Sequence, residues 1–133
     1  MDNKIYQIEE LDIKLGSFCV ICSKRASGKS VLTRNLVKHL LDTYDIQAII
    51  MFSETSQFNN DWEFIDKNLI YKTSQMDEKI EKILNIQRQN IKRGKKVNIL
   101  ILCDDILVHS RSKQLINLST FSRHLNITTI CAL

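Results

Sequence analysis

The sequence predicts an α/β domain in which a mainly parallel sheet is covered by helices on both faces. Short apolar runs typical of strands alternate with longer segments of helical periodicity, and this alternation is typical of parallel sheets. A Gly-Lys-Ser tripeptide separates the first strand pattern from the first helical pattern, and two aspartates follow the strongest strand pattern. Because ligands bind beyond the carboxyl ends of such strands, these observations also predict one ligand-binding edge.

Composition indicates a single domain that spans residues 1–133. The chain is 44% hydrophobic and 26% charged, which suits a protein with a sizeable core. Its formal charge of +4 fits phosphate or nucleic-acid partners, and equally an ordinary basic protein. No run reaches the ~18 apolar residues of a membrane span, and the polar N-terminus lacks a secretory pattern. We therefore expect an intracellular protein without a membrane span.

The strands are predicted from short apolar or alternating runs. Residues 4–15 alternate loosely, with Leu11, Ile13 and Leu15 on one face, and predict an N-terminal edge strand that turns at Gly16. The core, residues 18–133, contains the other predicted strands: 18–22, 48–52, a short one at 68–71, 97–103 and 127–133.

The helices are predicted from apolar residues three and four positions apart. Ser74-x-x-Asp77 resembles a capping box, and a long helix follows it to Gly94. A loop and a short helix are expected over 56–67. In two further helices, after residue 30 and near 112–124, the apolar stripes are Leu32, Leu36, Val37, Leu40 and Leu41, and Leu115, Leu118, Phe121 and Leu125.

The four cysteines are interpreted as core residues. Cys19 and Cys22 have the C-x-x-C spacing of redox and zinc sites, but in a strand they would point to opposite faces. Cys103 and Cys131 lie in other apolar runs. We expect small buried side chains in a reducing compartment rather than a metal site or a disulfide.

The stretch that ends in Gly-Lys-Ser predicts a phosphate-binding loop. It matches the second half of the Walker A pattern G-x-x-x-x-G-K-[ST], in which backbone N–H groups and a helix N-terminus surround a polyphosphate. Serine replaces the first glycine, at a cost of about 1 kcal/mol if that position needs a positive φ. Lys29 would bind the β- and γ-phosphates, and the Ser30 hydroxyl would bind Mg²⁺. The predicted nucleotide-binding residues are Ser23, Lys24, Arg25, Ala26, Ser27, Gly28, Lys29, Ser30 and Val31.

The aspartate pair predicts the second half of the same site. Asp104 follows a buried strand in the Walker B pattern, where a carboxylate orients Mg²⁺ opposite Ser30. Asp105 stands where many ATPases carry a glutamate that polarises the attacking water, and this role is favoured over that of a helix N-cap or loop residue. Residues 53–55 follow another predicted strand, so they should lie at the same edge.

Several basic and aromatic residues allow two interpretations. Arg123 and His124 end the last predicted helix, where they would serve as a phosphate sensor, as residues offered to a neighbouring subunit, or only as favourable charge at a helix C-terminus. For the basic residues 92–96 a solvated helix end is favoured over a DNA-binding patch. Trp62 is expected to be a packing residue.

With these motifs in order, the chain resembles the poxvirus-type genome-packaging ATPases of the FtsK–HerA group of P-loop NTPases, from large DNA viruses and virophages. The resemblance covers residues 18–133 and rests on Ser-Gly-Lys-Ser, Ile-Leu-Ile-Leu-Cys-Asp-Asp and Ser-Arg-His-Leu-Asn-Ile-Thr-Thr-Ile. It implies a three-layer P-loop NTPase sandwich with Lys29, Ser30, Asp104 and Asp105 in the roles given above. Arg123 matches an arginine that precedes the family's sensor strand.

The resemblance also implies a biological setting. Members form rings that hydrolyse ATP, with Mg²⁺, to push double-stranded DNA into capsids, so capsid proteins are implied partners. They act in the cytoplasm of an infected cell at sites of virion assembly, or in the virion. The family strand order places the last strand between the phosphate-loop strand and the Asp104 strand. The chain ends there, so we expect a motor domain that lacks its C-terminal part.

Two alternatives remain open from the sequence. A P-loop nucleoside or nucleotide kinase would share the phosphate loop, but the sequence has no evident arginine-rich lid. A catalytically weak nucleotide-binding assembly module would share both motifs and release no phosphate.

Overall fold

The chain forms a five-stranded, all-parallel sheet in the order β1-β5-β4-β2-β3. The computed structural model describes residues 13–21, 29–54, 62–104 and 112–132. The strands are β1 (Phe18–Ile21), β2 (Ala48–Phe52), β3 (Ile70–Tyr71), β4 (Ile99–Asp104) and β5 (Ile127–Ala132). The helices are α1 (Lys29–Thr43), α2 (Met76–Lys92) and α3 (Lys113–Phe121), with 3₁₀ turns η3 (Lys67–Leu69), η4 (Thr73–Gln75) and η6 (Ser122–Leu125).

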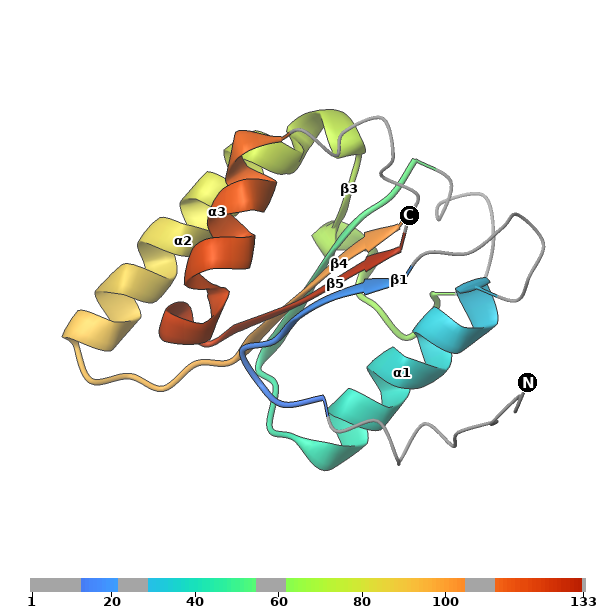
Figure 1. The fold of residues 1–133 in the computed structure, drawn as a ribbon, viewed down its shortest axis with the longest axis horizontal. Coiled ribbons are helices and arrows are strands. Elements are labelled where there is room, and N and C mark those ends of the chain that lie inside the picture. The colour runs from blue at the N-terminus through green and yellow to red at the C-terminus, as the bar shows by residue number, and fades with distance from the viewer. Residues whose placement is uncertain (1–12, 22–28, 55–61, 105–111, 133) are drawn as a thin grey trace, which may run out of the picture.

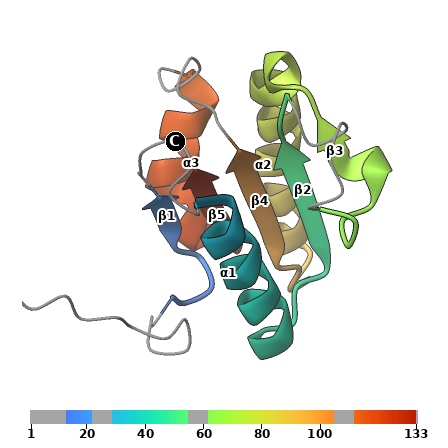
Figure 2. The same ribbon diagram turned by 90° about the vertical axis from the view of Figure 1, so that its right-hand side faces the viewer.

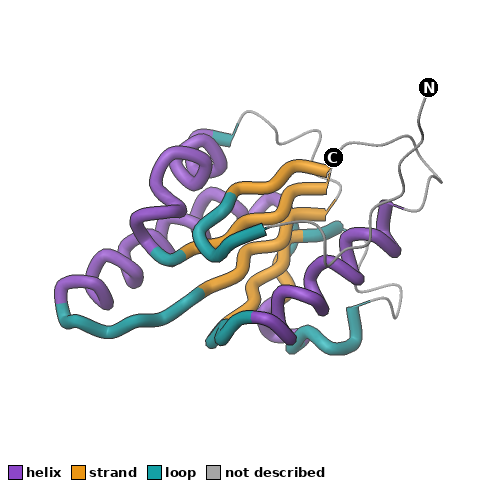
Figure 3. The backbone as a smooth tube through the Cα atoms, turned by 60° about the horizontal axis from the view of Figure 1, so that its bottom comes forward, coloured by secondary structure: helices purple, strands orange, loops and turns teal. Residues whose placement is uncertain are grey.

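Helices cover both faces of the sheet and make three layers. Helix α1 lies on one face, and α2 and α3 lie on the other (Figures 1 and 3). Strand β5 is inserted between β1 and β4 (Figure 2), as the resemblance implied. The predicted α/β class with a parallel, helix-covered sheet is therefore confirmed.

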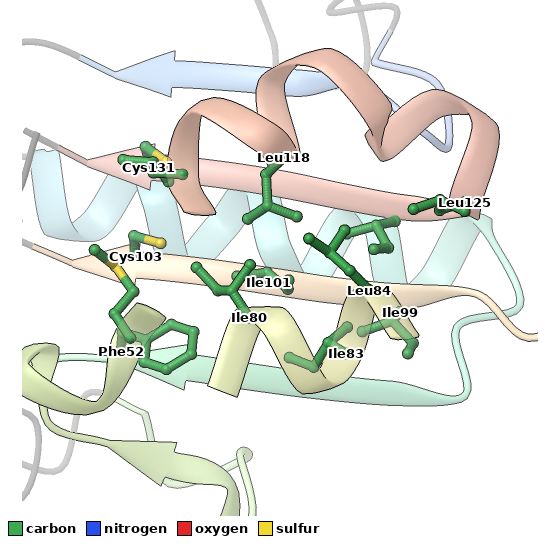
Figure 4. Close-up of a cluster of buried hydrophobic side chains, with 13 residues drawn as sticks. Phe52, Ile80, Ile83, Leu84, Ile99, Ile101, Cys103, Leu118, Leu125 and Cys131 are labelled. Carbon is green, nitrogen blue, oxygen red and sulfur yellow. The ribbon is translucent and has the colours of Figure 1, made fainter. Parts of the chain in front are cut away.

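Two apolar clusters hold the layers together. On the α2 and α3 face, Ile80, Ile101 and Leu118 meet in one cluster (Figure 4). On the α1 face, Leu36, Leu40 and Leu100 meet in the other, which also contains Trp62. Strand β4 is buried on both faces up to Cys103, as expected for a central parallel strand. Trp62 is 4% exposed, so its predicted packing role is confirmed.

The buried stripe of α1 differs from the predicted one at its start. Leu36, Val37 and Leu40 are buried as predicted, but Leu32 is 42% exposed. Thr33 takes its place, fully buried, because residues 33, 36, 37 and 40 share one helical face. The prediction that Leu32 faces the core was wrong.

Helix α2 begins one residue later than the capping-box pattern indicated. The turn η4 occupies residues 73–75, so Ser74 does not cap α2. The Asp77 carboxylate instead accepts a hydrogen bond from the Ser112 hydroxyl at the start of α3. The predicted end is confirmed: Gly94 has φ +70°, and Lys95 N–H donates to the Asn90 carbonyl (2.8 Å) in the Schellman arrangement.

Helix α3 also differs from its prediction at one residue. Leu115, Leu118 and Leu125 are buried, whereas Phe121 is 41% exposed. After Phe121 the chain tightens into η6, which turns Ser122 toward the interior (2% exposed). Residues 115, 118 and 122 share one helical face, so Ser122 rather than Phe121 takes the buried position, and the prediction that Phe121 faces inward was wrong.

The segment before β1 is a turn where it is described. Residues 13–17 contain no strand, so the C-terminal end of the predicted strand 4–15 is not a strand; residues 4–12 lie outside the described residues. The Ser17 N–H donates to the Lys14 carbonyl (3.2 Å), and Gly16 has φ +87°. A Cβ atom at Gly16 would lie 3.2 Å from the Arg123 Cα, so glycine allows both the turn and the close approach. None of the described helices is long and apolar enough to cross a membrane.

Candidate nucleotide-binding site

The parallel topology brings the predicted site segments to one edge of the sheet. All five strands run in the same direction, so the segments after β1, β2 and β4 leave from the same side. Helix α1 begins at Lys29, and its N-terminal end lies at this side of the sheet (Figure 1). The positive end of its dipole therefore favours an anion there.

Asp104 is the described carboxylate at the tip of β4, and Ser53 contacts it. The register aligns Phe52 with Cys103, so the next residue of each strand lies beside the other. Ser53 is 4% exposed, and its Oγ donates a hydrogen bond to Asp104 Oδ2 (3.4 Å). The contact restricts the orientation of a carboxylate that is only partly accessible to solvent.

Glu54 fastens the tip of β2 to the segment that leads into α2. Its Oε1 accepts hydrogen bonds from the Thr73 N–H (3.0 Å) and from the Thr73 hydroxyl. Thr73 is 3% exposed. The Ser53 N–H donates to the Tyr71 carbonyl (2.9 Å). These bonds hold Ser53 in place beside Asp104.

Sequence reasoning placed Ser53 and Glu54 at this edge but missed Thr73. No local pattern connects Thr73 to Glu54, because the two are 19 residues apart in sequence. The pairing of β2 with β3 brings them together. The sequence signal is only a threonine two residues after a short edge strand, and it is a weak one.

The remaining predicted nucleotide-binding residues are described in part or not at all. Ser23–Gly28 and Asp105 lie outside the described residues. For Lys29 and Ser30 the backbone forms the first turn of α1, while Val31, in the same turn, is 51% exposed. The roles of these residues in binding phosphate, binding metal and activating water remain predictions.

The described donors fit a magnesium ion. Mg²⁺ in nucleotide sites is usually held by one or two carboxylates together with phosphate and water oxygens. Asp104 supplies such a carboxylate, and its Oδ2 accepts a hydrogen bond from the Ser53 hydroxyl. Asp104, with the predicted hydroxyl of Ser30, would hold the ion.

Arg123 lies at the other edge of the sheet. It belongs to η6, which precedes the first residue of β5, whereas Asp104 is aligned with Ala132 near the end of that strand. Six strand residues span about 20 Å, which an arginine side chain does not bridge. The structure therefore does not bring Arg123 and Asp104 together within one chain, and the roles of Arg123 as a phosphate sensor, as a contact to a neighbouring subunit or as helix-end charge remain predictions.

The described cysteines behave as core residues, as predicted. Cys103 and Cys131 face each other on β4 and β5, both buried (Figure 4), and with Cys19 they are free thiols. The hydrogen bond between Cys103 and Cys131, together with burial, raises the pKa of Cys103 well above its ordinary value. Burial also raises the pKa of Cys19. Cys22 lies outside the described residues.

Comparison with known proteins identifies the family. The family model described as "Poxvirus A32 protein" matches residues 7–133. No curated protein matches the chain. The family match covers nearly the whole sequence and includes every described element, and the chain therefore belongs to the Poxvirus A32 protein family.

Proposed function

We propose that this chain is the ATP-binding and ATP-hydrolysing core of a motor that packages double-stranded DNA into viral capsids. The family is one of viral genome-packaging ATPases. The observation that carries the proposal for this chain is the position of Asp104: a buried parallel strand delivers its carboxylate to the edge where α1 begins. P-loop ATPases combine these two features.

Each residue has a distinct role in the proposed site. The backbone of Ser23–Gly28 and the Lys29 ammonium bind the β- and γ-phosphates. Asp104 and the Ser30 hydroxyl hold Mg²⁺, which, when bound, neutralises charge on the phosphates. Ser53 keeps the Asp104 carboxylate in one orientation. Asp105 accepts a proton from the attacking water.

Arg123 has its proposed role in an assembly. Its exposed side chain lies at the edge of the sheet opposite Asp104, so any contact with a nucleotide requires a second copy. In a ring, an arginine supplied by a neighbour stabilises charge that develops on the transferred phosphoryl group. Ring formation, capsid proteins as partners and a location at virion assembly sites in the infected cell belong to the same proposal.

The test is hydrolysis by an Asp105→Asn variant, with Asp42→Asn as the control because Asp42 is an exposed aspartate on α1. Phosphate release with Mg-ATP should fall at least about 100-fold in Asp105→Asn while ATP binding persists, because loss of a general base removes about 10²–10⁴ in rate. Asp42→Asn should match the parent. Unchanged turnover in Asp105→Asn would contradict the water-activating role. Transfer of phosphate to an added nucleoside would indicate a kinase instead.

A further inference from the structure

Two long stretches of the sequence carry positive charge without any acidic residue. Between Glu81 and Asp104, and again after Asp105, the chain contains lysines and arginines but no aspartate or glutamate. The formal charge of the whole chain is only +4, so the positive charge is concentrated in these stretches. Such asymmetry indicates a surface that attracts anions.

The fold gathers much of this charge at the edge of the sheet where β4 and β5 begin. The C-terminal end of α2 contacts η6, and the two lie close to the starts of these strands (Figure 1). Gln87 fixes the contact: its Nε2 donates to the Leu125 carbonyl (2.8 Å) and the Val97 carbonyl (2.7 Å). We call this surface the basic edge; its exposed cationic residues are Arg88, Lys92, Arg93, Lys95, Lys96 and Arg123.

The charge of the basic edge is not neutralised by the described part of the chain. On α2 the ion pair is Lys82–Glu78 (3.3 Å), which lies toward the other end of the helix. No basic-edge side chain forms an ion pair with a described carboxylate. Asp45 is the described acidic residue tied to this region, through its backbone carbonyl, which accepts from Asn98 Nδ2 (2.9 Å).

The composition of the basic edge fits a nucleic-acid backbone. Residues 81–98 contain no aromatic side chain, so they offer no platform on which unpaired bases would stack. Exposed lysines and arginines bind the phosphates of a duplex without reading its sequence. A packaging motor must hold DNA of any sequence, so this kind of contact suits the proposed function.

We propose that the basic edge binds the phosphate backbone of double-stranded DNA. The choice of DNA rather than another polyanion rests on the proposed function. The charge of the basic edge and the exposure of its residues are independent of that function. The surface lies at the opposite end of the strands from Asp104. DNA and nucleotide would therefore occupy opposite edges of the same sheet, joined by β4 and β5.

The test is binding of a fluorescein-labelled 30-base-pair duplex, measured by anisotropy without nucleotide over a range of salt. The variant carries Lys92→Gln, Arg93→Gln, Lys95→Gln and Lys96→Gln. The charge-matched control carries Lys38→Gln, Lys67→Gln, Lys72→Gln and Lys82→Gln, four exposed lysines on other surfaces. At 0.1 M salt the basic-edge variant should bind at least about 10-fold more weakly, and its salt slope should fall by about 3.6, since each of the four phosphate contacts contributes about 0.9.

The outcomes separate this proposal from the nucleotide site. The control should keep its affinity for the duplex within about 3-fold. An equal loss of affinity in both variants would show that the effect depends only on net charge and would overturn the proposal. So would unchanged binding in the basic-edge variant, or tighter binding of a single-stranded RNA of equal length. Lys29→Ala should bind the duplex like the parent, and the basic-edge variant should keep its DNA-independent ATP turnover. If the nucleotide-site proposal were disproved, the DNA-binding test would therefore still be valid.

Discussion

At the scale of single residues, the described part of the site depends on Asp104 and the groups that fix it. The carboxylate is held by a hydroxyl from the next strand, and that strand tip is held in turn by the bonds from Thr73 to Glu54. A buried hydroxyl that orients a metal-binding carboxylate acts through that carboxylate rather than on the substrate. Such outer groups typically change metal affinity by about 10–100-fold when removed.

Ser53→Ala should therefore raise the Mg²⁺ concentration needed for half-maximal ATP turnover by about 10-fold, with a smaller effect on ATP binding in the absence of metal. Ser53→Thr keeps the hydroxyl and should restore the parent Mg²⁺ dependence. Titration of turnover with Mg²⁺, and of bound Mn²⁺ by electron paramagnetic resonance, measures both. Equal Mg²⁺ dependence in Ser53→Ala and the parent would show that Ser53 does not position Asp104.

At the scale of elements, the strands were predictable because each is an apolar run between polar segments. Val97–Cys103 and Ile127–Leu133 gave β4 and β5 to within two residues. The end of α2 was predictable because Gly94 adopts the left-handed conformation that glycine favours. These features are local, so local patterns reveal them.

Features that depend on distant contacts were not predictable from local patterns. The turn η4 displaced the expected cap at Ser74, and Ser122 rather than Phe121 took the buried position next to Leu118. The bonds of Thr73 and Gln87 join residues far apart in sequence. The position of β5 between β1 and β4 was inferred only from a family resemblance, because no single segment encodes the order of strands. The distance between Arg123 and Asp104 was likewise not predictable from local patterns, because it depends on the direction of β5.

Gln87 is the clearest case of a structural role that sequence reasoning missed. It is 1% exposed and joins α2 to the segments that enter β4 and β5. Gln87→Leu should lower the free energy of unfolding by about 2–3 kcal/mol, because buried carbonyl groups lose their donor. Gln89→Leu, an exposed position of the same helix, should change it by less than about 0.5 kcal/mol. Urea denaturation measures the free energy of unfolding of both variants. An equal change in both would show that Gln87 does not stabilise the junction of α2 with the segments that enter β4 and β5.

At the scale of the whole molecule, the two edges of the sheet carry different chemistry. One edge combines the start of α1 with Asp104, and the other presents Arg123 and the basic edge. Within one chain, Arg123 and Asp104 lie toward opposite ends of β5. The proposed motor therefore needs contact between copies, so that the edge with Arg123 of one chain faces the nucleotide edge of another.

Mixing two inactive variants tests this arrangement. Lys29→Ala removes the phosphate-binding ammonium and Arg123→Ala removes the arginine, so each variant alone should hydrolyse ATP poorly. Mixed assemblies contain some sites in which both groups are present, and phosphate release should exceed the sum of the separate rates. A mixture with only the summed rates, under conditions in which parent chains associate, would contradict a role for Arg123 between subunits.

The central claim is that the edge of the sheet where α1 begins is a nucleotide site, and ATP affinity of Lys29→Ala tests it most directly. Isothermal titration with Mg-ATP should show binding by the parent and a loss of about 10–100-fold in Lys29→Ala, since a charge-assisted hydrogen bond contributes about 1.5–3 kcal/mol. Lys38→Ala, one exposed lysine further along the same helix, should bind like the parent. ATP bound as tightly by Lys29→Ala as by the parent would contradict the account.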